Sequence, residues 1–150
     1  MSGSIFSTFK IAASGLTSQR LRMDVISNNI ANAETTRTEA GGPYQRQQVV
    51  FTVNQPDTGF VPPNSIPTGS REPERGVKVQ EIVQDDSPGQ RAYDPNHPDA
   101  DEDGFVTYPN VNIVTEMTDM LSATRSYEAN VTVFNALKNM ALKALDIGQG

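Results

Sequence analysis

The residues of this chain with the most suggestive chemical spacing form an acidic turn. Asp99, Asp101 and Asp103 occupy every second position and a glycine follows them, which matches the first half of a calcium-binding loop, D-x-D-x-D-G. The second half departs from that pattern, because position twelve is Asn110 rather than a bidentate glutamate and Pro109 lies inside the loop. We therefore interpret the segment as an acidic, solvated turn, and metal binding by the three aspartates as the less favoured alternative.

Other catalytic or cofactor chemistry has little support in the sequence. The chain has no Cys and a single His, His97, so thiol catalysis, disulfides, thiolate zinc sites and multi-histidine metal sites are excluded. No G-x-S-x-G elbow or glycine-rich phosphate loop is present. The net charge of −6 argues against general binding to nucleic acid. We predict a protein that is not an enzyme, uses no cofactor and binds no nucleic acid.

The prolines divide the 150-residue chain into three parts. All ten lie between Pro43 and Pro109, and proline breaks helix interiors, so both ends of the chain are free to form long helices. We predict an α+β fold with an N-terminal coiled-coil helix in residues 1–40, a proline-rich β insert in residues 41–109 and a C-terminal coiled-coil helix in residues 110–150. The two helical segments together are expected to form one discontinuous domain.

The middle segment is typical of short strands and turns. β-branched and aromatic residues predict strands in residues 44–53, 77–83 and 104–108, and a Pro/Gly/Ser-rich loop lies between residues 56 and 73. The two terminal helices have no globular body of comparable size to pack against. We therefore expect them to pack on each other in antiparallel fashion, with the β insert at the far end of the pair.

Apolar residues in the two terminal segments recur at alternating spacings of four and three, which is typical of a coiled-coil seam. The first helix is expected to end near residues 34–38, and Asn110 or Asn112 to cap the second. We also include Asn28, Asn29 and Asn32 in the predicted interface, because a buried Asn can fix the register of packed helices. The predicted assembly interface comprises Ile5, Phe9, Leu16, Met23, Ile26, Asn28, Asn29, Ile30, Asn32, Met117, Met120, Tyr127, Val131, Phe134, Leu137 and Leu145.

A pair of helices with narrow apolar seams is marginally stable by itself, because most helical stability in proteins comes from tertiary packing. Additional neighbours would have to be other chains. We therefore expect the terminal helices to be ordered mainly by assembly. The alternative is an ordinary helical hairpin that completes a monomeric core.

The run S-N-N-I-A-N-A-E-T at residues 27–35 resembles the N-terminal signature of the flagellar basal-body rod, hook and hook-associated proteins, the bacterial axial family. The runs at 41–51 and 94–128 resemble the proximal-rod members of that family in particular. The similarity covers nearly the whole chain and leaves out chiefly the loop at about 55–75.

This resemblance implies a structural subunit of the rod, the drive shaft of the flagellum, whose terminal helices form a layer around a central export channel. It implies contacts with further copies of the chain, with the rod proteins FlgB, FlgF and FlgG, and with the rod-junction protein FliE. It also implies export through the flagellar type III apparatus to a rod that spans the periplasm.

The first ten residues lack the basic and apolar regions of a cleaved signal peptide, which agrees with such export. No run reaches the ~18 apolar residues of a membrane span, so no membrane insertion is expected. The alternatives are another rod- or hook-type axial subunit, or a calcium-binding periplasmic interaction module.

Overall fold

The computed structural model describes residues 2–54 and 76–148 of the chain. The elements in chain order are α1 (Ser2–Ala31), β1 (Gln47–Asn54), β2 (Gly76–Gln84), β3 (Arg91–Tyr93), β4 (Phe105–Thr107) and α2 (Ile113–Gly148). Two terminal helices with a small antiparallel strand insert between them confirm the predicted α+β class. The predicted loop at 56–73 lies outside the described residues, and so does the side chain of Ile5.

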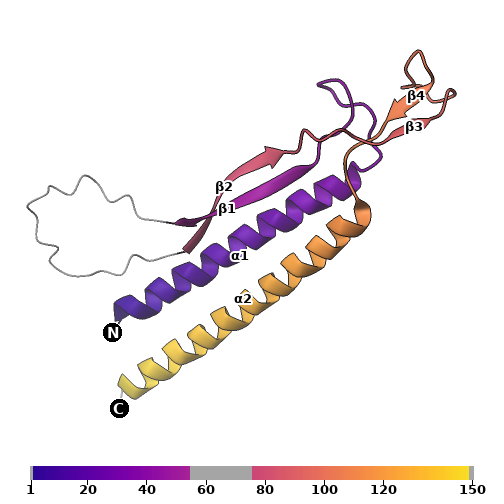
Figure 1. Ribbon diagram of the computed structural model, residues 1–150. Helices are drawn as coiled ribbons and strands as arrows, with labels where there is room; N and C mark the ends of the chain where they lie inside the picture. The colour runs from indigo at the N-terminus through magenta and orange to yellow at the C-terminus, as the bar shows by residue number, and fades with distance from the viewer. Residues whose placement is uncertain (1, 55–75, 149–150) are drawn as a thin grey trace, which may run out of the picture.

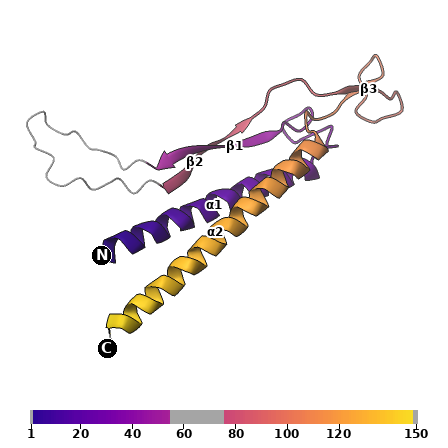
Figure 2. The ribbon, with the colours of Figure 1, turned by 60° about the horizontal axis from the view of Figure 1, so that its bottom comes forward.

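Helices α1 and α2 run antiparallel, so both ends of the chain lie at the same end of the molecule (Figures 1 and 2). Near that end the rings of Phe9 and Phe134 pack edge to face, with centroids 5.1 Å apart. Gly15 lies opposite the side chain of Asn130, and a Cβ at that position would come within 2.9 Å of its Nδ2 atom. The absence of a side chain at Gly15 therefore leaves room for the end of the Asn130 side chain between the two helices.

Helix α1 ends at Ala31, earlier than the predicted end near residues 34–38. The side chain of Asn32 donates a hydrogen bond to the carbonyl of Asn28 (2.9 Å), and the amide of Thr35 donates to the carbonyl of Asn32 (3.1 Å). These bonds satisfy the last turn of the helix and lead the backbone away from the helix axis. The prediction was wrong here because the apolar spacing continues past the point where the asparagine closes the helix.

Helix α2 begins after an asparagine cap. The Asn112 Oδ1 atom accepts hydrogen bonds from the amides of Val114 (3.0 Å) and Thr115 (3.2 Å), which is the bonding pattern of an N-cap. Of the two predicted caps, Asn112 is therefore confirmed. Asn110 instead accepts from the Arg46 amide (3.0 Å) and donates to the Asp85 carbonyl (3.0 Å), so it ties the second helix to the strand insert.

The strands form two separate antiparallel ribbons. In the longer ribbon β1 pairs with β2 from Gln47 opposite Gln84 to Asn54 opposite Gly76, with a bulge between Val50 and Phe51. The shorter ribbon pairs β3 with β4. Strand β3 was not predicted; it has only three residues and no apolar alternation.

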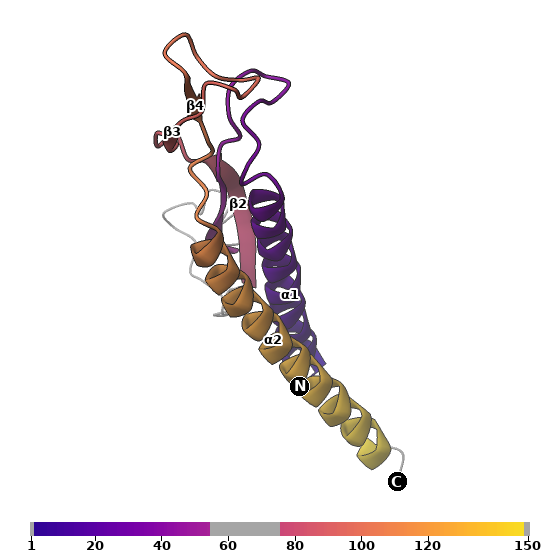
Figure 3. The same cartoon turned by 90° about the vertical axis from the view of Figure 1, so that its right-hand side faces the viewer.

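The two ribbons lie at different places along the helices (Figures 1 and 3). The β3–β4 ribbon is at the far end, as predicted, but the β1–β2 ribbon folds back along α1 toward the chain termini. The amide of Val77 donates to Ser14 Oγ of α1 (3.1 Å), and Gly76 packs so closely that a Cβ there would lie 2.7 Å from the same oxygen. The expectation that the whole insert lies at the far end is therefore wrong for β1 and β2.

The hydrophobic core of the described residues is thin. Apart from Pro109, the apolar side chains that are buried belong to Ala12, Val25, Ile26, Val106 and Ala123. Many larger apolar side chains stay exposed, and those on α2 are exposed along most of its length. Within the described residues no helix is both long and apolar enough to pass through a membrane.

Candidate functional site

The best-built polar site in the structure is a junction centred on Asn29, whose side chain is only 1% exposed. Its Nδ2 atom donates to the Gln47 carbonyl (2.8 Å) and to Glu116 Oε2 (3.0 Å). Its Oδ1 atom accepts from the Gln47 amide (2.9 Å) and from the Tyr44 hydroxyl (3.0 Å). A side-chain amide has two donors and an acceptor with two lone pairs, so every bond that Asn29 can make is made.

Glu116 brings a charge into the same junction. It is 1% exposed and lies in the first turn of α2, and its Oε1 atom accepts from Arg46 Nε at 2.6 Å. A buried carboxylate without a partner would be strongly destabilising, but here the guanidinium and the Asn29 amide together satisfy both of its oxygens. The junction therefore joins α1, the start of β1 and α2 through a single set of polar contacts.

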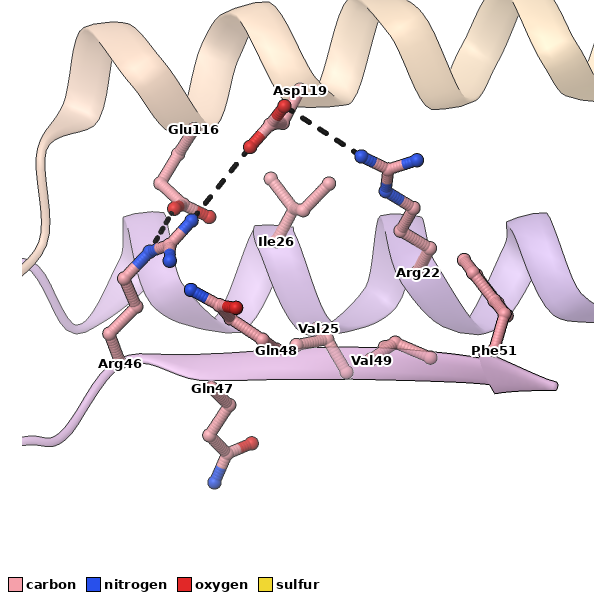
Figure 4. Close-up of a pocket in the computed structure, with 10 residues that line it drawn as sticks. All are labelled: Arg22, Val25, Ile26, Arg46, Gln47, Gln48, Val49, Phe51, Glu116 and Asp119. Carbon is pink, nitrogen blue, oxygen red and sulfur yellow. Dashed lines mark hydrogen bonds and ion pairs between the residues drawn. The ribbon is translucent and has the colours of Figure 1, made fainter. Parts of the chain in front are cut away.

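Beside the junction lies an open hollow of about 380 Å³ between the two helices and β1 (Figure 4). Asp119 of α2 lines this hollow, and its carboxylate oxygens lie 3.7 Å from Arg22 Nη2 and 3.8 Å from Arg46 Nη2. Two arginines thus face two carboxylates, and the charges balance. The charged groups bind one another, so the arrangement fixes the position of three elements.

Tyr44 contributes a neutral donor to the junction. Partial burial, and secondarily the negative charge of Glu116, raise the pKa of its phenol above the usual value of 10.0. The hydroxyl therefore stays protonated at neutral pH and remains able to donate to Asn29.

Of the three aspartates in the acidic turn, Asp101 closes the turn itself. Asp101 Oδ1 accepts from the amides of Phe105 (2.7 Å) and Asp103 (3.1 Å), and its Oδ2 atom pairs with Arg91 Nη2 at 2.7 Å. The hydrogen bond from the Phe105 amide is the main cause that lowers the pKa of Asp101. Asp99 accepts from Thr36 Oγ1 at 2.8 Å. Nowhere in the described ranges do three or more His, Cys, Asp or Glu side chains gather as they would around a metal ion.

The predicted interface residues fall into three groups by exposure. Ile26 and Asn29 are buried within the chain. Half-buried positions are Phe9, Leu16, Met23, Ile30, Asn32, Met120, Tyr127, Val131, Phe134 and Leu137. Asn28, Met117 and Leu145 are exposed. Phe9 and Phe134 of the seam pack on each other between α1 and α2, and the role of the seam in contacts with other chains stays a prediction.

Sequence reasoning missed the junction partners Tyr44 and Arg46 and the burial of Glu116. It also left the outward-facing Val114, Val133 and Met140 of α2 out of the interface. The sequence did contain a signal for these three residues, because each is an apolar residue of the second helix that lies outside the seam facing α1. No comparable signal exists for the junction, whose members are 87 residues apart at their extremes.

Comparison with known proteins places this sequence in a family. The model of the family "flagella basal body rod protein" matches residues 9–37, and that of "flagellar basal body rod FlgEFG protein C-terminal" matches residues 102–147. The flagellar basal-body rod protein FlgC of Borreliella burgdorferi is 50% identical over an alignment that covers 97% of this chain and 99% of the relative. The chain belongs to the FlgC family.

Other FlgC proteins are similar over equally long alignments. That of Bacillus subtilis is 46% identical over 96% of this chain and 98% of its own length, and that of Escherichia coli O6:H1 is 41% identical over 97% and 98%. The resemblance to the axial family that the motifs indicated is therefore confirmed. Both matched segments of the FlgC-family chain contain a partner of the polar junction, Asn29 in the first and Glu116 in the second.

Proposed function

We propose that this member of the FlgC family is a structural, non-enzymatic subunit of the flagellar basal-body rod, and that it assembles through the outward faces of its terminal helices. Family membership over nearly the full chain supports the first part and its interaction with other rod components. The observation that carries the second part is the exposure of large apolar side chains along α2, such as Val114 at 73% and Met117 at 61%.

Exposed apolar surface of this kind marks an interaction site, because a soluble monomer rarely leaves a long apolar stripe in water. The α1–α2 pair supplies a rigid antiparallel unit, and the Asn29–Glu116–Arg46 junction holds the β1–β2 ribbon at a fixed position on it. In the rod such units would pack as a coiled-coil layer around the export channel. Torque would then pass through packed helices instead of flexible linkers.

The neighbours of the subunit in the rod would be other rod proteins and further copies of the chain. FlgB, FlgF and FlgG, the junction protein FliE and further copies of this chain would cover the outward faces. The subunit would reach the periplasm-spanning rod through the flagellar type III apparatus, without cleavage of a signal peptide. Each of these contacts is a heterologous interface, in which one face of a subunit meets a different face of the next.

Complementation of a strain that lacks its FlgC gene tests the proposal. Met117→Asp puts a charge on the outward face of α2, where it would have to be desolvated in the assembly, so we expect loss of swimming and loss of the chain from purified basal bodies. Thr115→Asp is the matched control, because Thr115 is an exposed polar residue in the same helical turn. Swimming by the Met117→Asp strain, with that variant present in basal bodies, would contradict the proposed face.

A further inference from the structure

Two outward apolar stripes run along different faces of α2. Stripe A, in the first turns of the helix, consists of Val114, Met117 and Leu121, and all three are more than half exposed. Stripe B, in the second half, consists of Val133, Ala136 and Met140. Its two large side chains are exposed by 50% and 56%, and its alanine is exposed as well. The opposite side of α2 is already occupied, because Ala123 is buried and Phe134 packs on Phe9.

The two stripes have the same spacing. Stripe A steps by three and then four residues (114, 117, 121), and stripe B does the same (133, 136, 140), so the two sets differ by 133 − 114 = 19 residues throughout. Aligned in parallel with this shift, Val114 meets Val133, and Leu121 meets Met140. Met117 meets the small Ala136, and a large side chain opposite a small one lets two helix axes approach closely.

We propose that stripe A of one copy of this chain packs on stripe B of a second copy, with the two α2 helices parallel and shifted by nineteen residues. This inference rests on the proposed function and specifies one contact of the assembly. The shift corresponds to an axial displacement of about 28 Å at 1.5 Å per residue.

The direction in which the stripes face makes this contact open-ended. Nineteen residues are about 5.3 helical turns, so stripe B faces roughly 100° away from stripe A around the helix. A second copy that covers stripe A with its stripe B leaves its own stripe A free and rotated. Such a heterologous contact does not close on itself and propagates along a helical path.

The contact is small for a single pair of chains. Six side chains that each expose on the order of 100 Å² would bury about 600 Å², well below the ~1,200 Å² of a stable isolated complex. The dilute chain should therefore remain monomeric, and stripes A and B should pair when many contacts form together in an assembly.

Disulfide cross-linking tests this register, and the absence of native cysteines makes the result unambiguous. The variant Met117→Cys/Ala136→Cys carries a matched pair, and Leu121→Cys/Met140→Cys is a second one. Both are expressed in the FlgC-deficient strain, and basal bodies are oxidised and separated without reductant. We expect a ladder of linked copies from each double variant and no linked copies from any single variant, since a heterologous contact never brings identical positions together.

The mismatched variant Met117→Cys/Val133→Cys is the control. Its thiols are displaced by three residues from the proposed register, outside the Cα separation of about 4.4–6.8 Å that a disulfide requires, so at least roughly tenfold less linked protein is expected. Equal linkage in the mismatched variant would overturn the register. Dimers from the single variants would show a two-fold contact and would also overturn it.

Two further outcomes separate this inference from the proposed function. If the double variants swim and are present in basal bodies but give no ladder, or are linked to a different rod subunit, the second copy is the wrong occupant and the proposed function stands. If even the unaltered chain is missing from basal bodies, the proposed function itself fails.

Discussion

Asn29 is one residue on which three elements depend. Its side-chain amide donates to the Gln47 carbonyl of β1 and to Glu116 of α2. It also accepts hydrogen bonds from the Gln47 amide and from the Tyr44 hydroxyl. A polar residue buried in this way adds less stability than an apolar one of equal size. Its hydrogen bonds, however, are all made only when the surrounding elements are in one particular arrangement. We infer that its role is to fix the position of the ribbon on the helix pair.

Asn29→Asp should therefore be severely destabilising. The substitution removes both donors and places a second carboxylate against the buried Glu116, which should lower the free energy of unfolding by about 3–5 kcal/mol. Asn28→Asp is the matched control, because Asn28 is exposed on the same turn, and its effect should remain below ~1 kcal/mol. Urea denaturation followed by circular dichroism measures both. Similar midpoints for the two variants would show that the junction does not carry this role.

Gly89 is a second position where one atom matters. A Cβ there would lie 1.8 Å from the Tyr108 carbonyl oxygen, and a backbone oxygen cannot move aside without opening the segment that leads to α2. Gly89→Ala should cost more than ~2 kcal/mol of unfolding free energy. Gly15→Ala meets only the flexible end of the Asn130 side chain, and the better helix propensity of alanine, up to ~1 kcal/mol, should offset the rearrangement. A thermal melt in which Gly15→Ala is the more harmful variant would contradict this assignment.

At the scale of elements, the start of α2 depends on a local signal. Asn112→Ala removes the acceptor for two helical amides, and the expected loss is about 1 kcal/mol. Asn112→Asp keeps the acceptor and places a negative charge at the helix N-terminus, so it should be neutral or slightly stabilising. Helicity and the urea midpoint of the two variants test this. An equal loss in both would show that the cap does not stabilise the helix.

The β3–β4 ribbon should respond to acid through Asp101. Its folded-state pKa lies below the ordinary value of 3.8, chiefly because the Phe105 amide donates to the carboxylate. The ionised group therefore stabilises the turn above the unfolded pKa of about 3.9, and this contribution is lost as pH falls through the lower folded value. Titration of the Phe105 amide by NMR should show a midpoint below that of a model aspartyl peptide. A midpoint above it would contradict the hydrogen-bond assignment.

Elements marked by local chemistry were predictable from the sequence. The confinement of prolines to residues 43–109 indicated two terminal helices. The sequence limited the cap of the second helix to Asn110 or Asn112, and the hydrogen bonds of the structure single out Asn112. The position of the β1–β2 ribbon was not predictable, since it depends on contacts of Gln47 and Val77 with α1 across the chain. The same reason explains why Tyr44 and Arg46 escaped notice: their role exists only once Asn29 and Glu116 are brought together.

For the whole molecule, the thin core and the exposed α2 faces describe a subunit that is incomplete alone. The polar junction lies at the far end of the helix pair, close to the start of α2, while the chain termini lie at the other end (Figure 1). We expect a gradient of stability along the pair, with the terminal ends opening first in the isolated chain, because local opening is easiest where few apolar contacts are buried. Neighbouring subunits in the rod should remove this gradient.

Limited trypsin digestion with mass spectrometry measures that gradient most directly. In the dilute chain we predict early cleavage at Lys10, Lys138 and Lys143, near the exposed ends of α1 and α2, and slow cleavage at Arg22 and Arg46 beside the junction. In purified basal bodies all of these sites should resist cleavage. Full resistance of the dilute chain at both helix ends would contradict the account, because it would describe a self-sufficient hairpin that needs no neighbours.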